Sequence, residues 1–213
     1  MKKINVLELF KGTGSICKAL KTIEKNNDNL EINVISLDIE EKYNATHTCN
    51  ILDFDYKQYD KDYFNIIWGS PPCDKFSKLR NCWIGRTFKN GVLCTKELLE
   101  EEIKTIGLPP LYKLQEIINY FKPKYYFIEN PFTSLMKDYI DNKDFLYDIN
   151  KYVVSYCKYS SENDIFDYKK DTAFWTNLKG FNPKKCKNDC NYIININDNK
   201  KKHYKTLGNG YEL

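Results

Sequence analysis

The sequence predicts an α/β fold with a doubly wound, mostly parallel sheet, because apolar runs of strand length alternate with segments of helical periodicity. The runs with strand character are 4–9, 32–38, 49–52, 64–69 and 124–130. Helical spacing of apolar side chains occupies 16–25 and 111–121. Strands separated by helices imply a parallel sheet covered on both faces, and such sheets bind ligands at the carboxyl ends of their strands.

The last third of the chain predicts a different arrangement. Residues 153–157 and 172–177 have the character of a late antiparallel pair of strands. From about residue 183 the sequence is rich in Lys and Asn and has few apolar residues, which is typical of a peripheral hairpin or extended segment. We therefore predict one domain over 1–180 and a short C-terminal extension, a peripheral tail, over 181–213.

Composition excludes two broad classes of protein. The 213 residues are 42% hydrophobic and 29% charged, which is the balance of a globular chain and not of a disordered one. No run approaches the roughly 18 apolar residues that a membrane span requires. The first ten residues, MKKINVLELF, turn polar too early for a signal peptide. We therefore expect an intracellular protein, in the cytoplasm or, in a eukaryotic host, the nucleus.

The positive charge of the chain is nearly all lysine. The 33 basic and 29 acidic side chains leave a net charge of +4, which by itself does not indicate a nucleic-acid partner. Only Arg80 and Arg86 are arginines, and they lie within seven residues of each other. Because the planar guanidinium fork suits phosphates and base edges better than an ammonium does, this stretch is a candidate for nucleic-acid contact.

The cysteines do not have the character of a secreted disulfide framework. The chain has eight, at positions 17, 49, 73, 82, 94, 157, 186 and 190. We interpret most of them as reduced, buried, small apolar residues. Cys186 and Cys190, with His203 downstream, could form part of a zinc site, but a tetrahedral site needs four ligands and a fourth is not apparent. We therefore predict no metal site.

A glycine-rich turn follows the first predicted strand, in KGTGS at 11–15. Such a turn lets the backbone approach a ligand closely, with the N-terminus of a helix beneath it. It matches neither a P-loop nor the dinucleotide-binding GxGxxG, and a plain tight turn is the alternative interpretation. Asp38, an acid at the end of the second strand, lies where ribose hydroxyls are usually held. Together they predict a cofactor that carries a nucleoside.

A Pro-Pro-Cys sequence directly follows the buried strand at 64–69. The two prolines stiffen the turn and fix the direction of the Cys73 side chain. Such a mount suits a thiolate nucleophile that points into a cleft. The spacing alone leaves a structural role for Cys73 equally open.

The sequence YYFIENP at 125–131 ends an apolar strand with a carboxylate. Glu129 should reach the carboxyl edge of the sheet, where partial burial raises its pKa and suits it to hold or donate a proton. The alternative is a helix cap or turn acid before Pro131. If their two strands are near neighbours, Cys73 and Glu129 face one cleft.

In order and context these motifs resemble the cytosine-5 DNA methyltransferase family, and in particular its small phage-type members. The resemblance rests on ELFKGTGS, the acid at Asp38, GSPPCDKFS, YFIENP and KKDTAFWTN, and it covers about residues 4–177. It implies a Rossmann-like class I methyltransferase fold and S-adenosyl-L-methionine as the cofactor. It also implies methyl transfer to carbon 5 of cytosine in DNA.

The resemblance implies a role for each matching residue. Cys73 would add to carbon 6 of a flipped-out cytosine, and Glu129 would hold ring nitrogen 3 in its protonated form. Asn130 and Lys170 are assigned to the same catalytic group. The residues assigned to the cofactor are Phe10, Gly12, Thr13, Gly14, Ser15, Ile16, Asp38, Ile39, Asn50, Ile51 and Pro71. The residues assigned to DNA, within the family's mobile loop at 75–92, are Lys75, Ser77, Arg80 and Arg86.

Three departures from the family pattern keep alternatives open. Asn50 occupies the position where the family usually has an Asp that contacts the adenine of the cofactor. Lys170 and Thr172 occupy positions where the family often has two arginines. Only about 36 residues follow Asn177, too few for a separate target-recognition region, which a partner chain could supply. An RNA substrate such as tRNA, or an inactive subunit that binds cofactor or nucleic acid, are the alternative functions.

Overall fold

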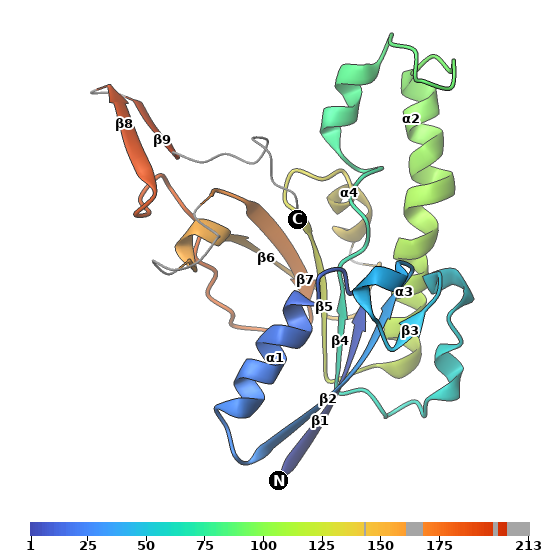
Figure 1. Ribbon diagram of the computed structural model, residues 1–213, viewed down its shortest axis with the longest axis vertical. Coiled ribbons are helices and arrows are strands. Elements are labelled where there is room, and N and C mark those ends of the chain that lie inside the picture. The colour runs from blue at the N-terminus through green and yellow to red at the C-terminus, as the bar shows by residue number, and fades with distance from the viewer. Residues whose placement is uncertain (143, 161–167, 198–199, 204–213) are drawn as a thin grey trace.

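The computed structural model describes residues 1–142, 144–160, 168–197 and 200–203. Its centre is a seven-stranded sheet with the order β3-β2-β1-β4-β5-β7-β6 (Figure 1). Strands β1 to β5 run parallel to their neighbours, and β7 lies antiparallel between β5 and β6. The strands are β1 Lys2–Leu9, β2 Leu30–Asp38, β3 His47–Thr48, β4 Ile66–Gly69, β5 Tyr125–Pro131, β6 Asn150–Ser155 and β7 Asp171–Thr176. The predicted α/β class and mostly parallel sheet are confirmed.

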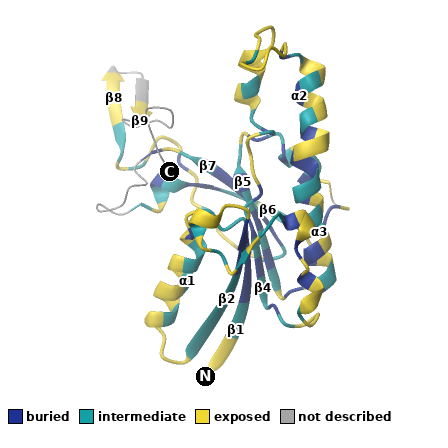
Figure 2. Ribbon diagram, turned by 45° about the vertical axis from the view of Figure 1, so that its right-hand side comes forward, coloured by how far each residue is buried: buried dark blue, intermediate teal, exposed yellow. Residues whose placement is uncertain are grey.

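Helices lie on both sides of the sheet but unequally. Helix α1, Ser15–Lys25, lies on one face. On the other face α2, Lys96–Glu102, continues through a π-helical turn, Ile103–Gly107, into α3, Leu108–Phe121 (Figures 1 and 2). The short α4 spans Lys137–Ile140. The 3-10 turns are Glu41–Tyr43, Ile51–Asp53, Tyr56–Gln58, Lys78–Trp83 and Tyr156–Lys158.

The hydrophobic core lies between the sheet and α3. Leu111, Leu114 and Ile118 recur at helical spacing and are fully buried against strand residues such as Ile67. At Gly69, a Cβ atom would come within 2.5 Å of the Leu114 side chain. Glycine at the end of β4 therefore lets α3 approach the strand that leads to Cys73.

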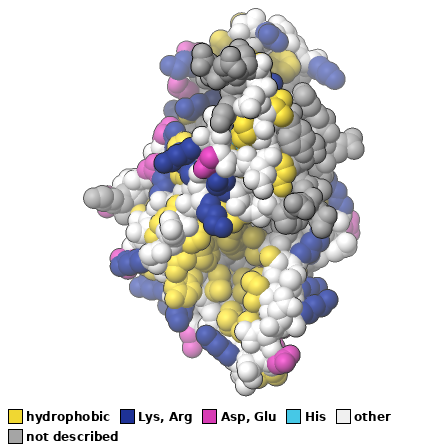
Figure 3. Space-filling model, turned by 90° about the vertical axis from the view of Figure 1, so that its left-hand side faces the viewer, with side chains coloured by type: hydrophobic (Ala, Val, Ile, Leu, Met, Phe, Trp, Pro, Cys, Tyr) yellow, Lys and Arg dark blue, Asp and Glu magenta, His cyan; other side chains and the backbone are white. Residues whose placement is uncertain are grey.

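The face of the sheet on which α1 lies is covered only in part. Helix α1 has no fully buried residue, and Trp68, Phe127 and Phe174 from three neighbouring strands line a cavity of about 160 Å³. The space-filling view shows apolar side chains gathered in a hollow on this side of the molecule (Figure 3). Helices therefore lie on both faces as predicted, but α1 covers this face only in part. The chain between β2 and β4 forms 3-10 turns and adds no α-helix to either face.

The predicted strand at 49–52 is also wrong. Strand β3 ends at Thr48, and the side chain of Asn50 caps a 3-10 turn by accepting a hydrogen bond from the Leu52 amide, 3.0 Å away. The apolar signal came from Ile51, which is buried within this turn. The late antiparallel pair is confirmed, since β6 and β7 pair with Val153 opposite Ala173.

Beyond the main sheet, strands β8, Ile193–Asn197, and β9, Lys200–His203, pair antiparallel in a two-stranded sheet of their own, the C-terminal hairpin. The hairpin and the segment 78–102 lie on either side of the carboxyl edge of the main sheet (Figures 1 and 2). Residues 204–213 of the predicted tail lie outside the described residues. Among the described helices none has the length and apolar character to cross a membrane.

Candidate active site

The turn between β1 and α1 has an unusual backbone. Phe10, Gly12 and Gly14 all have positive φ angles, of 61°, 51° and 72°. Glycine adopts positive φ angles without strain, but a phenylalanine rarely does. Strained backbone conformations of this kind are concentrated at functional sites. A Cβ atom at Gly12 would meet no atom within 4 Å, so the space beside this turn is open to a closely bound ligand.

Asp38 joins the ends of β1 and β2. Its Oδ2 accepts a hydrogen bond of 2.7 Å from the Gly12 amide, and its Oδ1 accepts one of 2.9 Å from the Glu40 amide. The residue is only 7% exposed. Because each carboxylate oxygen has two lone pairs, both oxygens can accept a further hydrogen bond from a ligand hydroxyl.

A cleft of about 430 Å³ opens beside this turn. Its lining residues are Glu8, Phe10, Lys11, Gly12, Thr13, Ser15, Ile16, Tyr43, Trp68, Ser70, Glu129, Tyr156 and Phe174. Five of the predicted cofactor residues are among them. The others, Gly14, Asp38, Ile39, Asn50, Ile51 and Pro71, lie outside this lining. Ile51 is buried in the core, whereas the Ile39 side chain is 63% exposed.

Glu8 is a feature of the cleft that the sequence interpretation missed. It is 2% exposed, and its Oε2 has no hydrogen-bond partner among the described residues. Burial raises the pKa of this carboxyl, against the opposing effect of the Cys17 backbone amide and the Lys11 charge. The sequence did contain a signal for Glu8, because it is an acidic residue within the apolar run LELF. Tyr43 and Tyr156, by contrast, stand in no pattern that marks a site.

The Pro-Pro-Cys loop is fixed to the end of the neighbouring strand. Strands β4 and β5 pair in parallel, with Gly69 opposite Ile128. The buried Asn130 side chain donates a 2.9 Å hydrogen bond to the Pro71 carbonyl. Asn130 therefore positions the loop that carries Cys73, which has an exposed surface.

The ionisable groups around this loop influence one another. The surrounding protein desolvates the Cys73 thiol and raises its pKa, while the positive charge of Lys170 opposes that shift and the Glu129 carboxylate adds to it. Burial likewise raises the pKa of Glu129, against Lys170 and the Ser70 hydroxyl. The Oε1 atom of Glu129 is buried and has no hydrogen-bond partner within the described chain. A carboxyl of this kind can remain protonated and donate to a ligand.

Lys170 reaches this group from the segment before β7. Its Nζ lies 5.0 Å from the centroid of the Tyr156 ring. The Lys170 carbonyl accepts a 3.0 Å hydrogen bond from the Tyr156 amide. Tyr156 thus holds both the backbone and the ammonium of Lys170 beside the cleft. Cys73, Glu129, Asn130 and Lys170, predicted from separate motifs, come together at one edge of the sheet.

The predicted DNA-contacting loop is part of an ordered arm, residues 75–102. The Arg80 guanidinium pairs with the Glu102 carboxylate at the end of α2, and Lys75 Nζ lies 3.7 Å from the same carboxylate. Arg86, by contrast, is exposed and lies 5.6 Å from the centroid of the Trp83 ring. The two arginines therefore differ, because one holds the arm together and the other faces outward.

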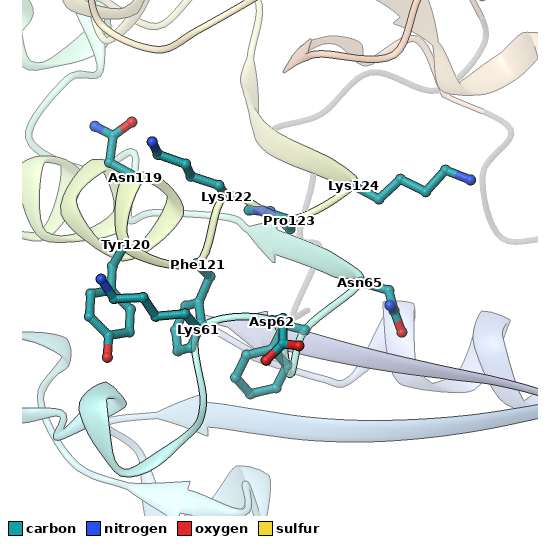
Figure 4. A pocket seen from close by; sticks show the side chains of 10 residues that line it. Lys61, Asp62, Asn65, Asn119, Tyr120, Phe121, Lys122, Pro123 and Lys124 are labelled. Atoms are coloured by element: carbon teal, nitrogen blue, oxygen red, sulfur yellow. The ribbon is translucent and has the colours of Figure 1, made fainter.

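A further cavity, of about 700 Å³, lies away from this chemistry. It is lined by residues that precede β4 and β5, such as Asn65 and Lys124, and by the end of α3. The side chains of Lys61, Lys122 and Lys124 point in different directions (Figure 4). This cavity lies at the amino ends of the strands, at the opposite end of the sheet from Cys73. Its charged side chains do not converge on one point where a ligand could bind.

No family model matches the chain. A probable DNA (cytosine-5)-methyltransferase of Frog virus 3 (isolate Goorha) is 37% identical over 184 residues, covering 86% of this chain and 75% of the relative. Among solved structures, the Entamoeba histolytica methyltransferase EhMeth matches with a TM-score of 0.56 and 18% identity, over 88% of this chain and 58% of that one. A putative DNA modification methyltransferase encoded within an E. coli prophage matches 81% of this chain and 46% of its own, with a TM-score of 0.49 and 14% identity.

The similarity to the Entamoeba structure establishes the methyltransferase fold, which is Rossmann-like and of class I, as predicted. This chain spans about 58% of that structure's length. The viral relative establishes more, because its similarity extends over most of both chains. The predicted family is thereby confirmed: the chain belongs to the DNA (cytosine-5)-methyltransferase family.

Proposed function

We propose that the chain transfers a methyl group from S-adenosyl-L-methionine to carbon 5 of cytosine in DNA. One observation carries the proposal. The Cys73 thiol and the Glu129 carboxyl arrive from neighbouring strands, and each is influenced by the charge of Lys170. A nucleophile and an acid that can hold a proton therefore lie near the same point, at the edge of the cleft that we assign to a nucleoside cofactor.

The cleft offers the groups that this cofactor needs. The space beside the glycine turn is open at Gly12, and Asp38 presents carboxylate oxygens to a ribose. Glu8 places on the same cleft a buried oxygen without a hydrogen-bond partner among the described residues, and this oxygen can form a hydrogen bond with the ligand. Ile39, which is exposed, would pack on the adenine, and the Asn50 side-chain carbonyl would accept a hydrogen bond from the adenine amino group. When bound, the cofactor supplies the methyl group.

The chain's own residues then activate the base. Protonated Glu129 donates a hydrogen bond to ring nitrogen 3, which makes the ring electrophilic, and the Cys73 thiolate adds to carbon 6. After carbon 5 has been methylated, it loses its proton to the solvent, the electron pair of that C–H bond reforms the ring double bond, and Cys73 leaves carbon 6 as a thiolate. The base must leave the duplex for this chemistry, because the reacting atoms of a base that is stacked and paired are not accessible to an enzyme's side chains.

The first test is transfer of labelled methyl to mixed-sequence duplex DNA and, in parallel, to total tRNA. Label in DNA alone is the expected result, and label in tRNA alone would make the substrate RNA. If neither is labelled while the cofactor binds, the chain is an inactive binding subunit or requires a partner chain for target recognition. Co-purification from the native host would distinguish these two cases.

Cofactor binding should stabilise the fold. At a ligand concentration about 100 times Kd, linkage adds about 2.7 kcal/mol to the free energy of unfolding. For a chain of this length we expect the melting temperature to rise by roughly 5–10 °C. Asp38→Ala should remove most of that rise, because it removes both the ribose contact and the hydrogen bond to Gly12. An unchanged melting temperature for the native chain at saturating S-adenosyl-L-methionine would contradict the cofactor assignment.

Arg86 should contact the DNA backbone more directly than Arg80. Arg86→Ala should weaken DNA binding and reduce the slope of log Kd against log salt by about 1, the loss of one phosphate contact. Arg80→Ala removes the pair with Glu102 and should lower the arm's stability, with a smaller effect on the salt slope. Fluorescence anisotropy at several salt concentrations measures both slopes, and an unchanged slope for Arg86→Ala would make its position ordinary surface. Lys75 and Ser77 are assigned to the same interface.

A further inference from the structure

Four potential metal ligands meet at the base of the C-terminal hairpin. They are Cys157, Cys186, Cys190 and His203, and their ligand atoms all lie within 4.8 Å of one another. Three of these residues are buried, and Cys190 is partly so. All three cysteines are free thiols. The sequence alone indicated three of these ligands and not the fourth, Cys157. This residue follows β6 and is distant in the chain from the other three.

The spacing of these atoms is that of a tetrahedral zinc centre. Zn–S bonds of about 2.3 Å and Zn–N bonds of about 2.0–2.1 Å separate sulfur from nitrogen by about 3.6 Å, and two sulfurs by about 3.8 Å. His203 Nε2 lies 3.6 Å from Cys186 Sγ and 3.1 Å from Cys190 Sγ. The atoms therefore need only small shifts to surround one ion.

The surrounding hydrogen bonds are those of a built site. The backbone amides of Asn188 and Asp189 donate to the Cys186 sulfur, within the loop between the two cysteines. The Cys186 amide in turn donates a 2.9 Å hydrogen bond to the fully buried Ser155 hydroxyl. Such bonds orient a thiolate ligand and are a regular part of metal centres.

We propose that Cys157, Cys186, Cys190 and His203 bind one structural Zn²⁺ ion. Three thiols lose their protons as the ion binds, and neutral His203 coordinates through Nε2. All four positions are filled by protein, so no position stays open for water or substrate, which makes the centre structural and not catalytic. The choice of zinc follows from three sulfur ligands and one imidazole, a donor set that tetrahedral zinc prefers.

The ion joins parts of the chain that are far apart in the sequence. Cys157 belongs to the 3-10 turn at the end of β6, while His203 ends the hairpin strand β9. Zinc therefore fastens the hairpin to the edge of the main sheet. It also fixes the neighbour of Tyr156, whose ring lies on Lys170 beside the cleft. The centre is thus one residue away from the candidate active site.

The test is the zinc content of the full chain, purified without chelator and without a histidine tag. Elemental analysis should find about one zinc per chain. Cys190→Ser and His203→Ala should lose it, and Cys82→Ser, which removes an exposed thiol outside the cluster, should keep it. Adding EDTA should speed proteolytic cleavage within 181–203, since the hairpin loses its attachment.

Replacement of the metal by Co²⁺ tests the geometry on the unaltered chain, so the result does not depend on the folding of a variant. Intense visible bands of tetrahedral cobalt with a thiolate charge-transfer band are expected. A weak, six-coordinate spectrum, or no bound zinc after incubation with Zn²⁺, would overturn the proposal. So would a disulfide between Cys186 and Cys190 in protein prepared under reducing conditions, detected by peptide mass.

Discussion

Replacing Cys73 with alanine should abolish methyl transfer and leave cofactor binding nearly unchanged. Cys73 is the only thiol at 70–77, and thiolates are far stronger nucleophiles than the serine hydroxyls of this loop, so we expect no neighbouring side chain to replace it. Loss of a nucleophile reduces turnover by a factor on the order of 10⁴ to 10⁶. The cofactor cleft does not include Cys73 among its lining residues, so the ligand-induced rise in melting temperature should persist. Methyl-transfer assays and thermal melts on the same preparation measure both.

A covalent trap makes this expectation sharper. In DNA that carries fluorine at carbon 5 of cytosine, the final loss of a proton is blocked, so the native chain should remain attached through Cys73. Cys73→Ala should form no such adduct on a denaturing gel. Cys17→Ala is the matched control, because this thiol lies on α1 and does not line the cleft. Turnover or an adduct in Cys73→Ala would contradict the assignment of the nucleophile.

The edge of the sheet could be predicted because parallel topology sends strand ends to one place. Asp38 and Glu129 each end an apolar run, and Cys73 follows one, so their common location required only the strand pattern. The same reasoning failed at 49–52, where an apolar pattern of four residues does not distinguish a strand from a buried turn. There, the side chain of Asn50 caps a 3-10 turn in competition with strand pairing.

Contacts between distant segments could not be predicted from local pattern. The pairing of Arg80 with Glu102 depends on how the arm folds back onto α2. The approach of Cys157 to Cys186 depends on where β6 ends relative to the hairpin. Tyr156 contacts Lys170 only because β6 and β7 pair side by side. Glu102, Cys157 and Tyr156 each have an ordinary local sequence, and their roles arise from tertiary placement.

The ionisation of Glu129 should determine the shape of the pH–rate profile. The productive form has a Cys73 thiolate and a protonated Glu129. The pKa of Cys73 is raised from its ordinary 9.0, and that of Glu129 is raised from its ordinary 4.5. Below the pKa of Glu129, kcat/KM falls as the pH falls, because thiolate is lost while the acid is already protonated. Above the pKa of Cys73 it falls as the pH rises, because only the acid's proton is then being lost.

Between these two pKa values the gain of thiolate cancels the loss of protonated acid, so the profile of the native chain should be flat. Glu129→Gln keeps a permanently neutral side chain that cannot lose a proton. Its profile should therefore rise about tenfold per pH unit up to the pKa of Cys73 and then level off, because only the thiol still titrates. At neutral pH the variant should be slower by about 10² to 10⁴, the usual contribution of a positioned acid.

Lys170→Gln separates this explanation from general damage to the site. Its ammonium lowers the pKa of both Cys73 and Glu129, so its removal should move both limbs of the profile to higher pH while the flat region remains. A damaged site would lower the whole curve without moving it. If Glu129→Gln kept the flat region of the native chain, a different group would hold the proton on the cytosine ring, and Glu129 would be a structural acid at the end of β5.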